Sequence, residues 1–285
     1  MTAPLDPIVL DRFAGIVGER FALRSPAEIE PYVTERRGLH PGVTPLVLRP
    51  GSVDEVSGIL KLATETKTPI VPQGGNTGLV GGGVPRGGEV VVSLTRLTDI
   101  VDFDSVSSEL TVGAGVTLAT LQDFARERGR SFGVDLASRA SATIGGMIAT
   151  NAGGIRVLRH GNMRAQVVGL EAVRADGAIL NRLPGLHKDN TGYDLPGLIA
   201  GSEGTLALIT RARLRLIPTF EARAVALLAV DSIDAALAML PALRRLGSLD
   251  AIEVFFREGL ELVLHHTRLP QPFAHTYPAY LLVEC

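Results

Sequence analysis

Apolar and polar residues follow a helical spacing near the start of the chain. Apolar side chains recur from Ile8 to Val17 at the three- and four-residue intervals of an amphipathic helix. Ser25-Pro26 is typical of the start of a second helix, with Ser25 as N-cap and Pro26 at the first helical position. Residues 1–40 are therefore predicted to form an N-terminal helical segment.

The next stretch combines strand and helix patterns. Residues 45–50 are a short apolar run, and residues 69–72 are another. Between them, Ser52 and Glu55 have the spacing of a capping box, and apolar residues follow at helical intervals. This order predicts a β-α-β unit that ends in a glycine-rich loop.

Strand patterns dominate the following hundred or so residues, interrupted by one helix that we expect to begin after Thr117. Asp176-Gly177 has the composition of a tight hairpin turn. The predicted strands occupy residues 89–94, 100–103, 109–112, 167–175, 178–180, 205–210 and 213–217.

The pattern restarts after Pro218. Residues 224–230, 252–256 and 280–283 are predicted strands, and residues 232–246 a helix. The last predicted strand lies at the end of the sequence, so we expect a second domain, residues 219–285, that is C-terminally incomplete. The remaining residues, 41–218, form the main predicted domain.

Composition narrows the classes of protein. The chain has 285 residues, a net charge of -2 and 46% hydrophobic residues, as in an ordinary globular protein without a basic surface for nucleic acid. Its one cysteine excludes an intrachain disulfide and a cysteine-rich zinc site. The sequence shows neither a signal-peptide pattern nor an apolar run long enough to span a membrane, so a cytoplasmic protein without an integral membrane segment is expected.

Glycine is enriched, with 32 residues, and is concentrated in three loops of small residues. The first follows the strand at 69–72, the second spans residues 135–154, and the third spans residues 201–205. Glycines after a strand leave backbone N–H groups free to bind a phosphate or pyrophosphate. Each loop alone could equally be a surface turn or a tightly packed helix start, but three together favour one extended ligand.

Two common phosphate-binding motifs fit poorly. No Lys-Ser or Lys-Thr follows the first loop, which excludes a Walker A motif. Gly113-Ala114-Gly115 precedes a predicted helix, and Asp135 follows at the distance of a ribose-binding acid. However, Leu118 stands where a dinucleotide fingerprint has its third glycine, and the preceding strand looks like part of an antiparallel hairpin.

Five segments, in this order and spacing, resemble the FAD-linked oxidases of the vanillyl-alcohol-oxidase type. They are PQGGNTGLVGG, DLASRASATIGGMIATNAGG, RHGNM, KDNTGYDL and GSEGTLALIT. Within that family they look most like the D-2-hydroxyglutarate and D-lactate dehydrogenases and the flavoprotein subunit of glycolate oxidase. The resemblance implies an α+β fold, in which a two-subdomain FAD-binding domain of the p-cresol-methylhydroxylase (PCMH) type precedes a cap domain, here partial.

The resemblance also implies the cofactor-binding residues. Six residues of the first loop would wrap the FAD pyrophosphate: Pro72, Gly74, Gly75, Asn76, Thr77 and Gly78. Nine would line the rest of the cofactor: Asp135, Ser141, Thr143, Ile144, Gly145, Gly146, Thr150, Asn151 and Gly154. Glu203, Gly204 and Ile209 would close over its far side. Some relatives tether the flavin through a histidine where Asn76 stands, so noncovalent FAD is expected.

The catalytic residues of the family are expected beyond Cys285, and no metal site is expected within this chain. Adjacent His265 and His266 would diverge on a helix, which disfavours a shared metal. Tyr193 and Lys188 belong to a family segment and are either functional or structural. Arg156 and His160 either approach the flavin or form a solvated basic turn.

The resemblance implies an FAD-dependent oxidoreductase that converts a D-2-hydroxy acid of the 2-hydroxyglutarate, lactate or glycolate class to the 2-oxo acid. Its partners would be that small molecule and an electron acceptor that the sequence does not name. Two alternatives remain: an FAD-binding module that is catalytically incomplete as this chain, and a flavin reductase acting on nucleotide sugars of the cell wall.

Overall fold

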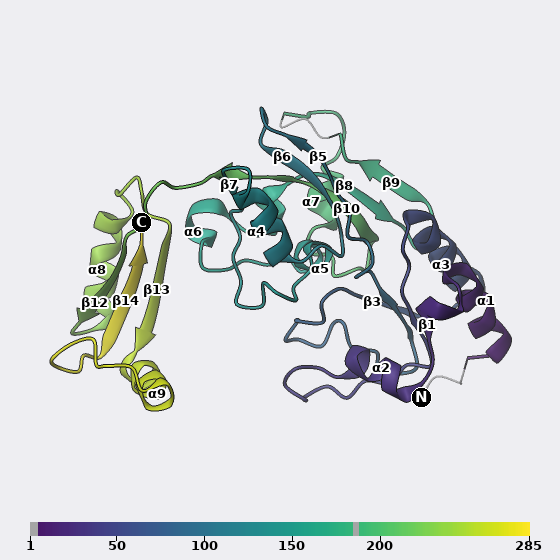
Figure 1. Ribbon diagram of the computed structural model, residues 1–285, viewed down its shortest axis with the longest axis horizontal. Helices are drawn as coiled ribbons and strands as arrows, with labels where there is room; N and C mark the ends of the chain where they lie inside the picture. Colours follow the sequence, from purple (N-terminus) through teal and green to yellow (C-terminus); the bar gives the residue numbers. More distant parts are fainter. Residues whose placement is uncertain (1–4, 185–187) are drawn as a thin grey trace.

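The computed structural model describes residues 5–184 and 188–285. It has the mixed α+β architecture expected from the sequence, with a large part built on two sheets and a small domain at the other end (Figure 1). Strand β11 (Ile217–Pro218) pairs with β7 (Arg130–Ser131), and the chain then crosses to the small domain. The division into domains at residues 40 and 218 stays a prediction.

The first sheet contains the predicted β-α-β unit. Its strand order is β1 (Ala22–Leu23), β2 (Val47–Leu48), β4 (Val90–Ser93), β3 (Ile70–Gln73). Strands β2 and β3 both pair with β4 in parallel, so β4 lies between the two strands that α3 (Val53–Thr66) connects. The parallel strands have both faces covered, which explains their continuous apolar runs.

Helices from the N-terminal segment cover this sheet. Helix α1 (Pro7–Val17) contributes Phe13 to the same core as α3, and the short η1 (Glu19–Phe21) leads from α1 into β1. Helix α2 (Pro26–Val33) lies against the opposite face, where Ile29 packs with Val47 and Val91. The described residues of this segment are therefore integral to the first sheet.

Helix α3 begins at the predicted N-cap, but the capping box is only half formed. Ser52 Oγ accepts a hydrogen bond from the backbone N–H of Glu55. The Glu55 carboxylate, however, accepts from the N–H of Gly51, at 2.7 Å, instead of that of Ser52. The Glu55 carboxylate thus binds the N–H group one residue before the N-cap, whereas the motif predicts that it binds the N–H group of the N-cap itself.

The second sheet has five antiparallel strands. Their order is β5 (Ile100–Asp104), β6 (Glu109–Gly113), β10 (Leu208–Arg215), β8 (Val167–Val173), β9 (Ile179–Arg182). The predicted hairpins at 100–112 and 167–180 are confirmed. The helices of this half are α4 (Leu118–Arg126), α5 (Ile144–Ala149), α6 (Val157–His160), η2 (Met163–Gln166) and α7 (Leu195–Ile199).

The prediction of two strands at 205–210 and 213–217 is wrong. Residues Leu208–Arg215 form the single central strand β10, which pairs with β6 on one side and β8 on the other. The pairing with β8 shifts register at two points, between Ile209 and Arg211 and between Arg213 and Leu214. Such irregularities interrupt the alternation along a strand, which explains why its pattern resembles two short strands.

The small domain is a three-stranded antiparallel sheet with one helix packed on its apolar face. Its strand order is β12 (Val225–Val230), β14 (Ala279–Glu284), β13 (Ala251–Phe256). Helix α8 (Ile233–Leu243) buries Ala236 against Leu281 and Val283. Helix α9 (Arg257–Thr267) follows β13 directly and presents Leu262 and Val263 to solvent.

Three basic residues join the two parts. Arg156, His160 and Arg159 lie in or beside α6 and contact Asp250, which immediately precedes β13. Asp250 and Arg156 are 2% and 6% exposed. The alternative of a solvated basic turn at Arg156 and His160 is therefore wrong. Both side chains contact Asp250, which lies 90 residues after His160 in the sequence.

Among the residues that the structure describes, no helix has the length and apolar character needed to cross a membrane.

The position of His160 generates a prediction for stability against pH. Burial lowers the pKa of His160 below its ordinary value of 6.5, opposed by the hydrogen bond to Asp250 and reinforced by the charges of Arg159 and Arg156. As the pH falls below about 6.5, the unfolded chain binds a proton that the folded chain resists, so folding is destabilised. His160→Gln removes this contribution.

We expect the free energy of unfolding to fall less steeply between pH 7.5 and 5.5 in His160→Gln than in the unmodified chain. The difference in slope is at most about 1.4 kcal/mol per pH unit, the value for one proton. Urea denaturation followed by circular dichroism measures both slopes. Identical slopes would show that His160 takes up its proton as readily in the folded chain as in the unfolded one.

Candidate functional site

A cavity of about 490 Å³ lies where the two sheets of the large part meet. Three separate segments line it: the loop that follows β3, the segment around α5, and the turn that leads into β10. Its volume is within the range of about 300–1,000 Å³ for small-molecule and cofactor sites. These are the three glycine-rich loops that the sequence singled out.

The loop after β3 presents free backbone donors. All of residues 74–84 line the cavity. The backbone N–H groups of residues 74–80 donate to no other group among the described residues. A row of unpaired N–H groups beside a cavity is the chemistry of an anion-binding nest, suited to a phosphate or pyrophosphate.

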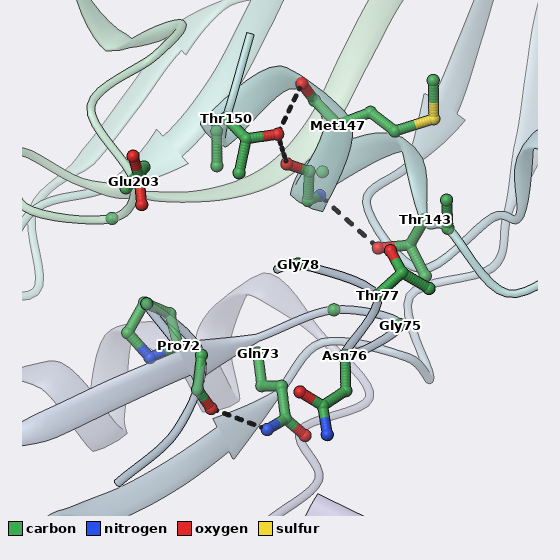
Figure 2. Close-up of a pocket in the computed structure, with 18 of the residues that line it drawn as sticks. Pro72, Gln73, Gly75, Asn76, Thr77, Gly78, Thr143, Met147, Thr150 and Glu203 are labelled. Atoms are coloured by element: carbon green, nitrogen blue, oxygen red, sulfur yellow. Dashed lines mark hydrogen bonds between the residues drawn. The ribbon is translucent and has the colours of Figure 1, made fainter. Parts of the chain in front are cut away.

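Amide side chains fix the conformation of this loop from behind. Gln73 is buried and its Nε2 donates to the carbonyls of Tyr32 and Gly83, each at 2.8 Å. Asn76 has a left-handed backbone, φ +51°, and its Nδ2 donates to the carbonyls of Pro31 and Thr34. Both amides point away from Met147 and Thr150 on the opposite wall (Figure 2). The loop is thereby tied to α2 and the residues that follow it.

The residues after α2 hold the far end of the loop. The Arg37 guanidinium donates to the carbonyl of Leu79 and also pairs with the Glu35 carboxylate, 3.3 Å away. Glu35 in turn accepts from the N–H of Leu39 at 3.1 Å. These contacts fix the backbone from both ends of the free N–H row, which leaves it preorganised for a ligand.

The first and second loops touch through their backbones. A Cβ atom on Gly74 would overlap Thr143 Oγ1, and one on Gly75 would overlap the carbonyl oxygen of Ser141. Only glycine allows the two segments to come this close. The contact brings the free N–H row of the first sheet against α5, which belongs to the second.

Side chains at both ends of α5 organise the opposite wall. Thr143 is the N-cap, and its Oγ1 accepts from the N–H of Gly146. Thr150 Oγ1 donates to the carbonyls of Gly146 and Met147, at 3.0 and 3.4 Å (Figure 2). The two glycines inside the helix, Gly145 and Gly146, place no side chain on this wall, so the cavity borders directly on the helix backbone.

The third segment closes the cavity from the side of β10. Glu203 has a left-handed backbone, φ +50°, and its carboxylate lies close enough to Gly82 that a Cβ there would come within 2.9 Å. A Cβ on Gly204, at φ +78°, would overlap the ring of Pro72. Glu203 is the one titratable residue among the described residues that line the cavity.

Most of the predicted cofactor-binding residues therefore meet at one place. Those that line the cavity are Pro72, Gly74, Gly75, Asn76, Thr77, Gly78, Thr143, Gly145, Gly146, Thr150, Glu203, Gly204 and Ile209. Those that do not line it are Asp135, Ser141, Ile144, Asn151 and Gly154. That the residues of either group bind FAD stays a prediction.

The five residues outside the lining shape the segments that form it. Asp135 is buried, pairs with Arg139 at 2.9 Å and accepts from Gln122 Nε2 at 3.1 Å. Ile144 is a fully buried core residue, and Asn151 Oδ1 accepts from the N–H of Arg164. Gly154, at φ +140°, packs its backbone against the carbonyl of Asp135.

The sequence assigned no individual binding role to several lining residues, although some of them lie inside the glycine-rich loops. Most are small or apolar, and only their place in the fold brings them to the cavity. They are Gln73, Leu79, Val80, Val84, Leu94, Ala114, Leu136, Ser138, Ala142, Met147, Ala149, Ala152, Ala207 and Leu208. Gly81, Gly82 and Gly83, which also line it, are the continuation of the first glycine loop of the sequence.

The dinucleotide fingerprint at Gly113-Ala114-Gly115 is wrong. Strand β6 before it is antiparallel to both of its neighbours, whereas the fingerprint needs a parallel βαβ unit. A Cβ on Gly113 would overlap the carbonyl of Leu97, and one on Gly115 would come within 2.5 Å of the carbonyl of Leu94. These glycines allow two chain segments to cross.

The remaining candidates lie away from the cavity. His265 and His266 stand side by side near the end of α9, with ring centroids 5.2 Å apart. Tyr193 is 91% exposed and Lys188 is exposed as well. Across the two described ranges, 5–184 and 188–285, no group of three or more histidine, cysteine or acidic residues has an arrangement that could hold a metal ion.

Comparisons with known proteins agree on a flavin-binding fold. Residues 44–182 match the family model described as an FAD binding domain. The chain is 43% identical over 260 residues to the D-2-hydroxyglutarate dehydrogenase of Xanthomonas citri pv. viticola, covering 91% of this chain and 55% of that protein. The chain spans about half the length of the curated relatives that it matches.

Solved structures share the architecture at low sequence identity. An alkyldihydroxyacetonephosphate synthase has a TM-score of 0.81 at 20% identity, covering 100% of this chain and 57% of its own. A p-cresol methylhydroxylase has a TM-score of 0.77 at 17% identity, covering 98% of this chain and 60% of its own. These likenesses show the fold.

The residues around the cavity fit FAD. The free N–H row suits its pyrophosphate, and the glycine contacts between the first two loops leave backbone exposed where a long ligand could lie across it. Apolar residues such as Leu94, Met147 and Leu208 suit the faces of its rings.

The backbone contact between the first two loops generates a test of the site's construction. Gly75→Ala should lower the free energy of unfolding by about 1–3 kcal/mol, as overpacking does, because its Cβ meets backbone that cannot move aside cheaply. Gly78→Ala is the matched control, since a Cβ there meets nothing within 4 Å, and its effect should stay within about 0.5 kcal/mol.

Urea denaturation of the ligand-free protein measures both variants. Equal stability of the two would contradict the close approach of the loop to Ser141.

Proposed function

With its FAD-binding domain at residues 44–182 the chain belongs to the FAD-linked oxidases of the vanillyl-alcohol-oxidase type, and we propose that it is an FAD-dependent dehydrogenase of D-2-hydroxy acids. The observation that carries the proposal is the row of free N–H groups at residues 74–80 on the wall of a cavity of cofactor size. The Xanthomonas relative, a D-2-hydroxyglutarate dehydrogenase, supports 2-hydroxyglutarate as a member of the substrate class, and lactate and glycolate are smaller acids of the same class.

In this proposal each segment has its own task. Residues 74–78 hold the pyrophosphate through their backbone N–H groups, as the free donors there suggest, and Pro72, which has no N–H, borders the same site. Residues from 135 to 154 line the remainder of the cofactor, and Glu203, Gly204 and Ile209 close its far side. The redox chemistry comes from the bound flavin, whose N5 atom is the hydride acceptor.

The described cavity supplies binding and orientation but little acid-base chemistry. Oxidation of a 2-hydroxy acid removes the hydroxyl proton to a base and the α-hydrogen as hydride, and it needs cationic groups to hold the carboxylate. No arginine, lysine or histidine is among the described lining residues. This favours the second candidate, an FAD-binding module to which other parts of a longer protein add the base and the carboxylate clamp.

The first experiment distinguishes these candidates. The purified chain should be yellow, with a flavin absorbance spectrum, and acid precipitation should release FAD into the supernatant. Bleaching by D-2-hydroxyglutarate, D-lactate or glycolate would support a complete enzyme, whereas bound but unreactive flavin would support the module. Bleaching by NADPH alone would favour a reductase of nucleotide sugars, and a chain that binds no added FAD would contradict both proposals.

We also propose that FAD is held noncovalently. The Asn76 side chain stands where some relatives carry their tethering histidine, and here it binds the carbonyls of Pro31 and Thr34. Flavin that stays with the acid-precipitated protein would contradict this part of the proposal.

The role of Asn76 generates a further prediction. Asn76→Asp replaces a donor by a carboxylate that faces two carbonyls, beside a loop proposed to bind phosphates, and FAD affinity should fall by at least about tenfold. Asn76→Gly keeps the left-handed backbone at no steric cost and removes only the amide, so its loss should be smaller. Titration of the ligand-free variants with FAD, followed by flavin fluorescence, measures both. An affinity of Asn76→Asp equal to that of the unmodified chain would contradict the anchoring role.

A further inference from the structure

The contact between the large part and the small domain is centred on one buried carboxylate. Asp250 is 2% exposed and lies just before β13. Its Oδ2 is 2.9 Å from Arg156 Nε, and its Oδ1 is 3.0 Å from His160 Nε2. Because a carboxylate only accepts hydrogen bonds, the neutral His160 ring donates through Nε2–H. Asp250, Arg156, Arg159 and His160 are called the Asp250 cluster below.

Arg159 extends this contact to the backbone of the small domain. Its Nη1 donates to the carbonyls of Gly247 and Leu249, at 3.0 and 2.7 Å. Its guanidinium also lies 5.1 Å from the ring centre of Phe220, in the connection between the two parts. Residues 156–160 of the large part therefore contact both the small domain and the connection that leads to it.

The charges of the cluster require Asp250. Arg156 and Arg159 bring two permanent positive charges, with side chains 7% and 29% exposed. The other nearby acid, Glu284, is 3.9 Å from Arg156 and is shared with Arg223 of the connection, 3.8 Å away. Without Asp250, the buried guanidinium of Arg156 would lose its nearest carboxylate while the positive charge of Arg159 remains nearby, which is unfavourable.

The segment that contains Arg156, Arg159 and His160 directly follows residues of the cavity wall in the sequence. Thr150 and Ala152 line the cavity, and Arg156 follows four residues after Ala152. Between them, the backbone of Gly154 packs against the carbonyl of Asp135. A Cβ on Gly133 would come within 2.9 Å of His160 Cβ, so the irregular segment between β7 and Asp135 packs against the cluster as well. The small domain is thus fixed to the segment that walls the cavity.

We propose that Asp250 is a positioning residue that fixes the small domain to the segment that follows the cavity wall. It acts through Arg156, Arg159 and His160, and it does not line the cavity. Loss of its charge releases the small domain, while the residues that line the cavity keep their positions. This inference does not depend on the proposed function.

The first test uses limited proteolysis of the full chain. Arg223 is an exposed trypsin site in the connection, 3.8 Å from Glu284, and the next residue, Ala224, pairs with Cys285 through both backbone groups, so cleavage requires this edge of the small domain to open. Cleavage after Arg223 should be about tenfold faster in Asp250→Asn, since proteolysis follows the population of the open form. Asp231→Asn is the matched control, because Asp231 is an exposed carboxylate of the same domain that pairs with no described residue.

Mass spectrometry gives the cleavage rate after Arg223 relative to that after Arg36, an exposed residue that follows α2. The control should stay within about twofold of the unmodified chain, as expected for a surface substitution. Equal cleavage after Arg223 in Asp250→Asn and Asp231→Asn would overturn the proposal. Asp250→Glu keeps the charge and should restore most of the protection.

A milder variant covers the case in which Asp250→Asn does not fold. Arg159→Ala removes the donors to Gly247 and Leu249 from a partly exposed position, so it should fold and show an intermediate cleavage rate. Circular dichroism verifies folding of each variant. Unchanged cleavage in a folded Arg159→Ala would contradict the role of Arg159 in holding the small domain.

The second readout concerns the cofactor. Because none of the described residues of the small domain lines the cavity, Asp250→Asn should bind FAD with an affinity within about twofold of that of the unmodified chain. A large loss of FAD affinity with unchanged cleavage after Arg223 would overturn the proposal. If the chain binds no FAD, the proposed function fails, while the proteolysis result still decides whether Asp250 holds the domain.

Discussion

The architecture of the site depends on the close approach of two glycines of one segment to the chain of another. Gly74 and Gly75, at the end of a parallel strand of the first sheet, lie directly against Ser141 and Thr143, which precede a helix packed on the second sheet. Any side chain on these glycines would push the two segments apart. The contact joins the two sheets at the cavity, brings the three glycine-rich loops together, and sets the width of the space in which the FAD-binding domain holds its ligand.

This construction explains why the cavity carries so few charges. Its anion-binding capacity resides in the free N–H groups of residues 74–80, held in place from behind by Gln73, Asn76 and Arg37. Backbone donors that are already oriented need no arginine or lysine to neutralise a pyrophosphate. The basic residues near the second loop serve a different purpose, since Arg156 and Arg159 attach the small domain. Cofactor binding and domain attachment thus use neighbouring but separate stretches of chain.

Local physical chemistry accounts for what the sequence could predict. Apolar periodicity identified β2, β3 and β4 of the first sheet and the two hairpins of the second, but it missed the short β1 and divided β10 into two strands. The side chains of Ser52 and Thr117 cap their helices as expected. Clustering of small residues located all three loops that line the cavity. Long-range pairing accounts for the rest. Nothing local distinguishes Gly113 and Gly115, which let chain segments cross, from glycines beside a ligand. Likewise, the burial of Arg156 depends on Asp250, far along the chain.

The central claim is that the loop after β3 binds the cofactor through its pyrophosphate, and a comparison of ligands tests it most directly. Isothermal titration of the ligand-free chain with FAD and with riboflavin, which lacks the phosphates and the adenosine, gives both affinities. Two or more charge-assisted hydrogen bonds from backbone N–H groups predict that FAD binds at least about 100-fold more tightly. Equal affinities for FAD and riboflavin would contradict the account.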